Sequence, residues 1–574
     1  MKGERFFFVL ILVLLLVAGF GCSEEDESGS VTTSSSFVPD TTDTTGTTDT
    51  TPDTPSPFSA QAVTFNYIDR DMDAGELWGD ITIAKATDET AVTQYRLYWG
   101  ESTTTKLAGQ NMISSLTADG TDKSHSFAQN STIPAGATHL LVYTAYVDAT
   151  NDIESTSPTA LDIPDGVIEL VKEINPSGSS NPGFFSKLGD LLFFYATNSS
   201  GETDPYKSDG TETGTIKIET GGNPPGGETA VMGGYLYFPS SDGVTFYREI
   251  FKSDGTTTSR VTGIYSSGNS NPEFLTVMGT NLYFKATDSP SNTKVWGTDG
   301  SSVFSASNYK SNLTSIAAVN STLFYSGVGA SGDSLWKSDG TAVTESEVIS
   351  SFYSGSLNNF TAFNSKLFFT AAETSNSNNI ELWVSDGSAV NTTELTVNAS
   401  TTAYSKNLKE FNGWLYFTAR SDTSASDGEL WRTDGTTTTQ VKKLCTACWA
   451  DPDNLSVVGS NLYFSAQDDS NGKELWVTNG TTTTMVKDIN SGGGSSPENL
   501  TAVGNNVFFA AEDGINGREL WFSDGSAEGT FLLHDFNLGS NGMEAGDLLL
   551  VGENLFIGAR GDSANEELWR YYVK

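Results

Sequence analysis

The segment Glu519-Leu520-Trp521-Phe522-Ser523-Asp524-Gly525 decides the fold, because it recurs along the chain at a nearly constant spacing. A ninth and last copy, Glu567-Leu568-Trp569, stands near the C-terminus, and the glycines of the other copies follow one another at intervals of 40 to 48 residues. An aromatic strand such as Phe508-Phe509 precedes every copy. The chain therefore contains nine similar units. In the seven earlier copies, a pair ending in an aromatic residue comes two residues before Asp-Gly or Asn-Gly: Leu475-Trp476, Leu430-Trp431, Leu382-Trp383, Leu335-Trp336, Val295-Trp296, Ile250-Phe251 and Pro205-Tyr206.

A period near 45 residues without a helical pattern is typical of a β-propeller, in which each unit forms one blade of four antiparallel strands. In one unit we expect these strands at 500–503, 507–510, 519–522 and 531–534. Asp524-Gly525 is then a hairpin turn, because glycine tolerates positive φ and aspartate can accept hydrogen bonds from turn amides. The recurring Trp side chains are expected to fill the space between blades, with a carbohydrate-stacking surface as the alternative.

The repeat resembles the ELWxxDGT repeat family of bacterial proteins over residues 166–574. The resemblance implies an exported or surface-associated protein with propeller-like repeats, and it brings no catalytic residues. Residues 167–174 are similar to the fourth-strand sequence 485–489, while the ninth unit ends after its third strand. We therefore expect residues 167–174 to complete the last blade, which would remove exposed sheet edges. The prediction is an all-β ring of about nine blades, with eight blades plus a degenerate unit as the alternative.

Residues 58–165 carry a different pattern, in which short segments of alternating polarity are separated by turn signals. This pattern is typical of a β-sandwich, and it resembles the fibronectin type III-like modules of bacterial surface proteins. Tyr143 and Tyr146 are candidates for the tyrosine corner of such a module. The expected strands are 63–67, 81–83, 95–99, 124–127, 140–146 and 159–163.

The N-terminus carries a targeting signal. Lys2 and Arg5 precede an apolar run at 6–20, which is too short to span a bilayer and ends at Gly21-Cys22. The arrangement resembles a bacterial lipoprotein signal, which implies cleavage before Cys22, acylation of Cys22 and an outer-membrane anchor; an ordinary secretory signal is the alternative. Residues 1–21 are then the signal peptide. Residues 22–57, rich in Thr, Ser, Asp and Pro, form a disordered tether that can hold the folded part away from the membrane.

Charge and cysteine content narrow the function classes. The formal net charge of −40 argues against a nucleic-acid partner, which needs basic surface. With Cys22 acylated, Cys445 and Cys448 are the two cysteines left, and an exported compartment favours a disulfide between them. The alternative is a redox motif, but such motifs stand at the start of a helix, and the repeat pattern predicts none here.

Calcium is the one cofactor that the sequence suggests. Asp69, Asp71, Asp73 and Asp80 partly resemble a calcium loop, in which clustered carboxylates supply oxygen ligands. An acidic turn between two strands is the alternative. Acidic residues before the third strand of several units offer a second set of candidates, for which solvated loop tips are the alternative: Asp288, Asp468, Asp469, Glu512 and Asp513.

The sequence leaves three function classes open. The first is a binding or adhesion module of the cell envelope, anchored through Cys22 and exposing the propeller to a protein or glycan. The second is a carbohydrate-active enzyme, a hydrolase or lyase with a carboxylate site on the propeller face. The third is a scaffold component of the envelope. We expect a non-enzymatic binding or scaffold role, because no residue pattern singles out a catalytic site among the 71 acidic side chains.

Overall fold

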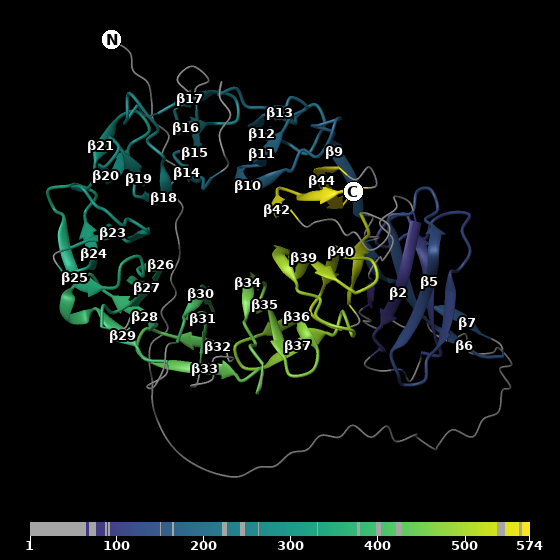
Figure 1. The fold of residues 1–574 in the computed structure, drawn as a ribbon. Coiled ribbons are helices and arrows are strands. Elements are labelled where there is room, and N and C mark those ends of the chain that lie inside the picture. The colour runs from purple at the N-terminus through teal and green to yellow at the C-terminus, as the bar shows by residue number, and fades with distance from the viewer. Residues whose placement is uncertain are drawn as a thin grey trace, which may run out of the picture. The chain divides into compact units, whose positions relative to one another are not determined.

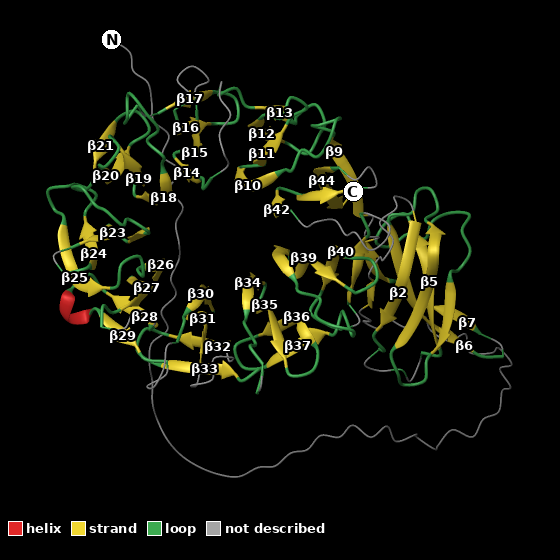
Figure 2. Cartoon of the chain, viewed as in Figure 1, coloured by secondary structure: helices red, strands yellow, loops and turns green. Residues whose placement is uncertain are grey.

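The computed structural model shows β-structure throughout the described part of the chain (Figures 1 and 2). The described residues are 65–67, 76–86, 89, 92–149, 151–162, 166–220, 227–241, 247–261, 263–329, 331–375, 379–397, 403–420, 428–446, 448–527, 529–536, 546–561 and 565–573. Within them the one helical element is a 3-10 turn, η1 (Ala389–Asn391). No helix among these residues has the length and apolar character needed to cross a membrane. The predicted signal peptide (1–21), Cys22 and the predicted tether (22–57) lie outside the described residues.

Two sheets form the predicted sandwich. One sheet has the order β1-β2-β5, and the other has the order β4-β3-β6-β7 with β8 also paired to β6. This division is the one expected of a fibronectin type III-like module, and the core between the sheets contains Tyr95, Leu97 and Leu140, all with no exposed surface. The strands are β1 (Phe65–Tyr67), β2 (Glu76–Ile83), β3 (Gln94–Gly100), β4 (Ser114–Thr117), β5 (Lys123–Thr132), β6 (His139–Val147), β7 (Asp152–Glu154) and β8 (Thr159–Asp162).

The tyrosine-corner expectation is wrong in detail. The Tyr143 hydroxyl donates to the Thr104 carbonyl at 3.2 Å, far along the chain, and the Tyr146 hydroxyl donates to Asp148 Oδ2 at 3.1 Å. Neither hydroxyl binds a backbone group a few residues upstream, as a tyrosine corner requires. Strands β4 and β7 were not predicted, because they are short and their sequences carry little apolar alternation.

Nine four-stranded antiparallel sheets make up the rest of the described chain, and we number them as blades one to nine. The first strand of each blade lies toward the centre of the ring and the fourth lies at its rim (Figure 1). Blade one is β10 (Gly183–Leu188), β11 (Leu191–Thr197), β12 (Thr203–Ser208) and β13 (Ile216–Lys217); blade two is β14 (Ala230–Met232), β15 (Tyr235–Ser240), β16 (Glu249–Ser253) and β17 (Thr258–Arg260); blade three is β18 (Glu273–Met278), β19 (Asn281–Thr287), β20 (Thr293–Thr298) and β21 (Val303–Ser305).

The middle of the array repeats this arrangement with slightly longer strands. Blade four is β22 (Ile316–Val319), β23 (Thr322–Val328), β24 (Asp333–Ser338) and β25 (Ser346–Phe352); blade five is β26 (Asn358–Phe363), β27 (Lys366–Ala372), β28 (Ile380–Ser385) and β29 (Thr393–Leu395); blade six is β30 (Lys406–Phe411), β31 (Trp414–Arg420), β32 (Gly428–Thr433) and β33 (Thr438–Lys442).

The last three blades include the unit whose strands the sequence predicted in full, and all four are found there. Blade seven is β34 (Asp453–Val458), β35 (Asn461–Asp468), β36 (Gly472–Thr478) and β37 (Thr483–Lys487); blade eight is β38 (Glu498–Val503), β39 (Asn506–Glu512), β40 (Arg518–Ser523) and β41 (Thr530–His534); blade nine is β42 (Leu548–Val551), β43 (Asn554–Arg560), β44 (Glu566–Val573) and β9 (Gly166–Lys172).

The ring closes as the sequence predicts. Strand β9 pairs antiparallel with β44, with Leu170 opposite Trp569 and Val167 opposite Tyr572, so the two ends of the repeat array share one blade. Strand β10 of blade one packs against β42 of blade nine, which completes the circle of neighbouring blades. Nine blades are present, and the alternative of eight blades plus a degenerate unit is wrong.

The Asp-Gly turn forms for the predicted reason. Gly525 has φ +95°, and Asp524 Oδ1 accepts a hydrogen bond from the Ser526 N–H at 2.8 Å. Asn479 replaces the aspartate in blade seven with the same geometry, because its Oδ1 accepts from the Thr481 N–H at 2.9 Å.

The recurring Trp side chains belong to the core between blades, as expected. Trp383, Trp476 and Trp521 are only 5 to 6% exposed, and Trp521 packs with Tyr463 and Leu475 of the preceding blade. In the first two blades, which lack this Trp, Tyr206 and Phe251 are equally buried. Burying such rings between sheets stabilises the contact of one blade with the next.

Candidate functional site

A buried glutamate opens most Glu-Leu-Trp copies, and its carboxylate fastens one blade to the segment that leads into the next. Glu474 shows the full arrangement. Its Oε2 accepts from the Ile489 N–H at 3.1 Å, and its Oε1 accepts from the Ser495 N–H at 2.9 Å. The Ser495 hydroxyl donates to the same carboxylate. The corresponding Glu249 and Glu567 also accept from serine hydroxyls, those of Ser270 and Ser180.

These carboxylates act in the scaffold rather than in an open site. Glu474 has no exposed surface and Glu567 is 4% exposed. Burial raises the pKa of both groups above the usual range, although their hydrogen bonds oppose that rise. A carboxylate enclosed in this way is paired by the backbone of the next connector and cannot meet a substrate from solvent.

Cationic side chains connect neighbouring blades at the rim. On the third strand, Lys252 Nζ donates to the Gly300 carbonyl of the next Asp-Gly turn at 2.8 Å, and Arg432 donates to the Gly480 carbonyl at 2.9 Å. On the fourth strand, Lys442 donates to the Thr483 carbonyl of the next blade at 2.8 Å. Charged donors make strong hydrogen bonds, so these residues stabilise the order of the blades.

Asparagine side chains on the innermost strands also form hydrogen bonds between neighbouring blades. Asn407, Asn454 and Asn499 all have positive φ, between +54° and +58°, in a bulge of the first strand. Their amides donate to carbonyls of the following blade, at Pro452, Pro497 and Gly546, over 3.0, 3.2 and 2.8 Å. Asparagine tolerates this backbone region better than most residues. The recurring polar positions are therefore occupied by contacts between blades.

The predicted calcium residues divide into two groups. Asp69, Asp71 and Asp73 lie outside the described residues, so the calcium loop stays a prediction. Asp80 lies within β2, opposite Ser126 of β5, because that strand begins at Glu76 rather than at position 81. Asp80 is thus part of a strand, and its role as a calcium ligand stays a prediction.

The aspartates predicted as calcium candidates before the third strands have partners within the protein. Asp468 Oδ1 accepts from the Ser470 and Asn471 amides at 2.8 and 2.7 Å, and Asp513 Oδ1 accepts from two amides of its own turn in the same way. Asp288 pairs with Lys294 at 3.0 Å. Most of these carboxylates therefore close the hairpins in which they lie.

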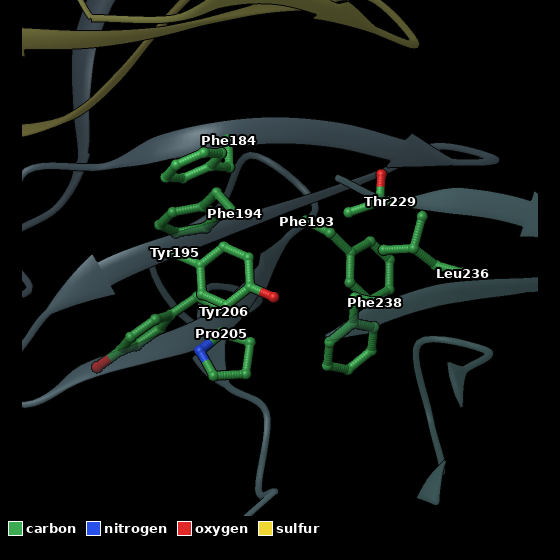
Figure 3. Close-up of a pocket in the computed structure, with 9 residues that line it drawn as sticks. All are labelled: Phe184, Phe193, Phe194, Tyr195, Pro205, Tyr206, Thr229, Leu236 and Phe238. Carbon is green, nitrogen blue, oxygen red and sulfur yellow. The ribbon is translucent and has the colours of Figure 1, made fainter. Parts of the chain in front are cut away.

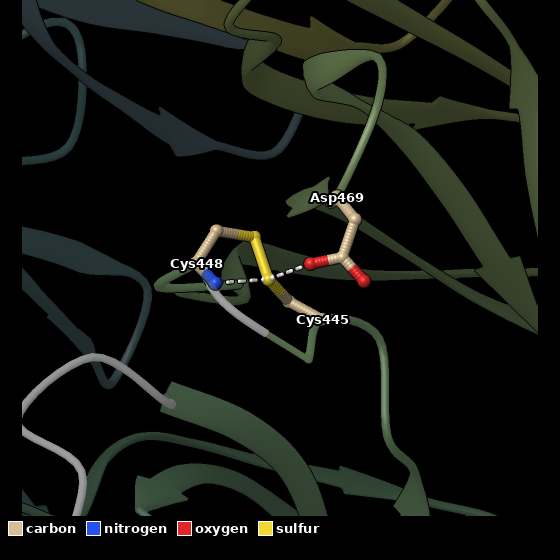
Figure 4. A group of neighbouring side chains, drawn as sticks. All are labelled: Cys445, Cys448 and Asp469. Carbon is tan, nitrogen blue, oxygen red and sulfur yellow. Dashed lines mark hydrogen bonds between the residues drawn. A yellow bond between two sulfur atoms is a disulfide. The ribbon is translucent and has the colours of Figure 1, made fainter.

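Cys445 and Cys448 form the expected disulfide, with their Cα atoms 5.5 Å apart (Figure 4). Asp469 lies beside it, with Oδ1 3.0 Å from Cys445 Sγ and a hydrogen bond from the Thr446 N–H at 3.0 Å. The two sulfurs and the Asp469 carboxylate are close enough to share a metal ion. Only free thiolates ligate metals, so the oxidised pair serves to constrain the loop.

Two clefts near the inner strands differ in the room they offer. The seam between blades one and two, lined by Phe184, Phe194, Tyr206, Leu236 and other apolar groups, leaves only about 10 Å³, which is space for about one water molecule (Figure 3). A wider cavity of about 390 Å³ lies along the first strands of blades seven to nine and blade one. Its lining includes Phe184, Asn454, Asn499 and Asp547.

A third cavity, of about 300 Å³, lies between blades five and six. Tyr404, Ser405 and Lys406, which lead into blade six, form one side, and Trp449 from the connector after blade six forms another. Tyr404 and Trp449 are each 37% exposed. The repeat pattern did not predict this site. The signal that could have found it is the pair Tyr404-Ser405, which stands where blades seven and eight have Asp451-Pro452 and Ser496-Pro497.

No protein-family model matches the chain, and no curated protein matches it. Among solved structures, the computationally designed Ika8 protein is similar over 71% of this chain and 100% of its own length, at 13% identity and a TM-score of 0.39. The β-propeller domain of the Trilobed protease from Pyrococcus furiosus is similar over 62% of this chain and 97% of its own, at 10% identity and a TM-score of 0.31. A prolyl endopeptidase is similar over 53% of this chain and 48% of its own, at 12% identity and a TM-score of 0.35.

Proposed function

We propose that this chain is a non-catalytic binding or scaffold protein of the bacterial cell envelope, anchored to the outer membrane through acylated Cys22. Its propeller meets a protein or glycan outside the membrane. The anchor is supported by the apolar run 6–20 followed by Gly21-Cys22 and by the Thr- and Ser-rich segment after it.

One observation supports the binding role. The side chains that recur from blade to blade make contacts between neighbouring blades and so stabilise the ring. The buried glutamate, the aromatic residue of the third strand and the inner asparagine all contact the neighbouring blade or its connector. A ring fixed in this way is a rigid support, and recognition then falls to residues that do not recur. Rigid supports lower the entropy that a partner's binding costs.

The anchor is tested by expressing the full chain and a Cys22→Ala variant in a Gram-negative host that is fed an alkyne-labelled fatty acid. The full chain should carry the label and sediment with outer membranes, whereas the variant should be unlabelled and soluble. An unlabelled, freely soluble full chain would contradict the anchor.

The binding role is tested with the soluble Cys22→Ala chain on an array of glycans and envelope or matrix proteins. Saturable binding to at least one ligand is expected, with no product formed from it. Turnover of a polysaccharide panel would instead support the hydrolase or lyase alternative.

A further inference from the structure

We propose that the cavity between blades five and six is a saccharide-binding site, with Tyr404 and Trp449 as its aromatic walls and the Ser405 hydroxyl as a polar contact. The proposal rests on the proposed binding function and names the ligand class. It starts from a departure of blade six from the pattern of the other blades.

The segment leading into blade six keeps the backbone of the repeat but changes its side chains. Tyr404 has φ +47°, close to the +43° of Asp451 and the +45° of Ser496 at the equivalent positions. Positive φ is costly for a bulky residue, whereas Asp and Asn adopt it more readily. A tyrosine that is exposed in this backbone region therefore costs stability without contributing much core packing, and such strain is characteristic of functional positions.

Ser405 supplies a second, independent observation. It is 3% exposed, and its hydroxyl has no hydrogen-bond partner among the described residues, yet it lines the cavity. The equivalent residues, Pro452 and Pro497, have no polar side-chain atom. A buried hydroxyl without a partner is destabilising, and a ligand hydroxyl in the cavity would remove that cost.

Trp449 is held at the cavity from three sides. The disulfide Cys445–Cys448 closes the loop that ends directly before it (Figure 4). The Arg420 guanidinium lies 4.7 Å from the Trp449 ring centre and 4.1 Å from that of Tyr404, so one cation connects the two aromatic walls. Gly428 leaves the room that the indole needs, because a Cβ there would lie 2.7 Å from Trp449 Nε1.

The Arg420 guanidinium lies against both aromatic walls, but the lining residues, with Lys406 paired, carry no net charge and the formal net charge of the chain is −40, which favours a neutral sugar over an anion. Lys406 is the charged residue of the lining, and its Nζ lies 2.6 Å from Asp451 Oδ1. Burial raises the pKa of Asp451, but the hydrogen bond and charge of Lys406, the charge of Lys473 and a hydrogen bond from Trp449 outweigh that effect and hold the pKa below its usual range. Asp451 is therefore ionised at neutral pH, and it neutralises Lys406.

A sugar ring matches the remaining chemistry. It presents an apolar C–H face to an aromatic ring and hydroxyl groups at its edge, and Asn358, Asn359 and Ser405 offer polar atoms around the aromatic walls. A purely apolar ligand would leave the Ser405 hydroxyl unpaired. The volume of about 300 Å³ is at the lower end of the range of small-ligand sites, so the site suits a short stretch of a glycan rather than a folded partner.

The experiment uses the full chain with Cys22→Ala in calorimetric titrations against cellohexaose, xylohexaose, maltohexaose and mannohexaose, each up to about 10 mM because single sugar sites are weak. A hexamer of galacturonic acid is titrated in the same way as the anionic ligand for comparison. Trp449→Ala and Ser405→Ala test the site, and Phe184→Ala is the matched control, because Phe184 is an exposed aromatic residue with positive φ, +58°, in blade one.

At least one neutral hexasaccharide should bind, and the anionic hexamer should bind more weakly. Trp449→Ala should weaken binding at least about tenfold and Ser405→Ala about threefold to tenfold, whereas Phe184→Ala should keep the affinity of the parent. Reduction of the disulfide should weaken binding as well, because it releases the loop that carries Trp449. An unchanged unfolding midpoint in Ser405→Ala excludes misfolding as the cause.

Two results would overturn the site: no hexasaccharide binds, or the one that binds is unaffected by both Trp449→Ala and Ser405→Ala. Either result leaves the proposed function standing if the array identifies another ligand whose binding does not depend on Trp449. If the array is negative as well, the binding function itself fails.

Discussion

The segments leading into blades six and eight have nearly the same backbone, but they differ in how fully their buried polar side-chain atoms are hydrogen-bonded. Ser495-Ser496-Pro497 precedes blade eight and Ala403-Tyr404-Ser405 precedes blade six, with φ of +45° at Ser496 and +47° at Tyr404. In the first segment the Ser495 hydroxyl and both carboxylate oxygens of Glu474 have hydrogen-bond partners. In the second, polar atoms are left over.

The two glutamates show the difference directly. Glu474 accepts hydrogen bonds from the Ser495 amide and the Ser495 hydroxyl, whereas Glu381 accepts one from the Ala403 amide at 3.1 Å. Because alanine has no hydroxyl, Glu381 lacks the donor that Ser495 gives Glu474, and among the described residues its Oε2 is buried with no well-formed hydrogen bond. Blade eight follows the repeat for stability, and blade six departs from it where the candidate site lies.

The largest expected effect is the difference in stability loss between substituting Trp521, which packs between blades, and Trp449, which lines the cavity. Trp521→Ala removes a nearly buried ring from the packing between blades seven and eight and should lower the free energy of unfolding by about 3–5 kcal/mol. Trp449→Ala removes a partly exposed ring and should cost less than about 1.5 kcal/mol. Urea unfolding followed by circular dichroism measures both, and equal losses would contradict the distinction between scaffold and site.

The second largest effect is the difference in stability loss between substitutions of Glu474 and Glu381. Glu474→Ala leaves the Ile489 amide and both donors of Ser495 buried without an acceptor, so it should cost about 3 kcal/mol. Glu381→Ala removes the acceptor of the Ala403 amide and of a weaker contact with Asn379, and should cost about half as much. The same urea titrations provide the measurement. A larger loss at Glu381 would mean that its carboxylate has a role that the hydrogen bonds do not reveal.

The repeat made most of the ring predictable. Trp521, Asp524 and Gly525 or similar residues recur at a nearly constant spacing, so they indicated the strand, the turn and the approximate number of blades. The similarity of 167–174 to 485–489 predicted the closure of the last blade. The cavity was not predictable in this way, because Tyr404 and Trp449 occur once and come together only when the connectors before and after blade six are placed in space. The sequence does contain the break in the pattern at Tyr404-Ser405. That break indicates a functional position only once the positive φ of the equivalent residues, Asp451 and Ser496, is known.

The ionisation of Glu381 gives the third expected effect. Burial raises its pKa from the ordinary value of 4.5 to about 7, with a smaller contribution from the charge of Glu394, against the opposing hydrogen bonds from the Ala403 amide and the Asn379 side chain. The folded state therefore binds this proton more tightly than the unfolded chain does. The stabilisation is complete below about pH 4.5 and is lost as the pH rises toward about 7, a change of about 2–3 kcal/mol.

Glu381→Gln should remove this pH dependence, because the amide keeps an acceptor for the Ala403 N–H and does not titrate. The difference in unfolding free energy between parent and variant, measured in urea from pH 4.5 to pH 8, should shift in favour of the variant as the pH rises. Parallel pH profiles would show that Glu381 titrates alike in the folded and unfolded chains.

The smallest expected effect comes from exchanging the residue at which the two segments differ beside the glutamate, Ala403 before blade six and Ser495 before blade eight. Ala403→Ser places a donor where Ser495 has one, so it should give Glu381 Oε2 a partner, lower the pKa of Glu381 and raise stability near pH 8 by about 1 kcal/mol. Ser495→Ala makes the reverse change and should lower stability by about 1–2 kcal/mol, because Glu474 loses a hydroxyl donor. Opposite signs are expected because the two backbones match, with φ at the following residues differing by only a few degrees. If both substitutions destabilise, the connector of blade six is packed too tightly for a hydroxyl, and its unpaired carboxylate reflects a difference in shape rather than the missing donor.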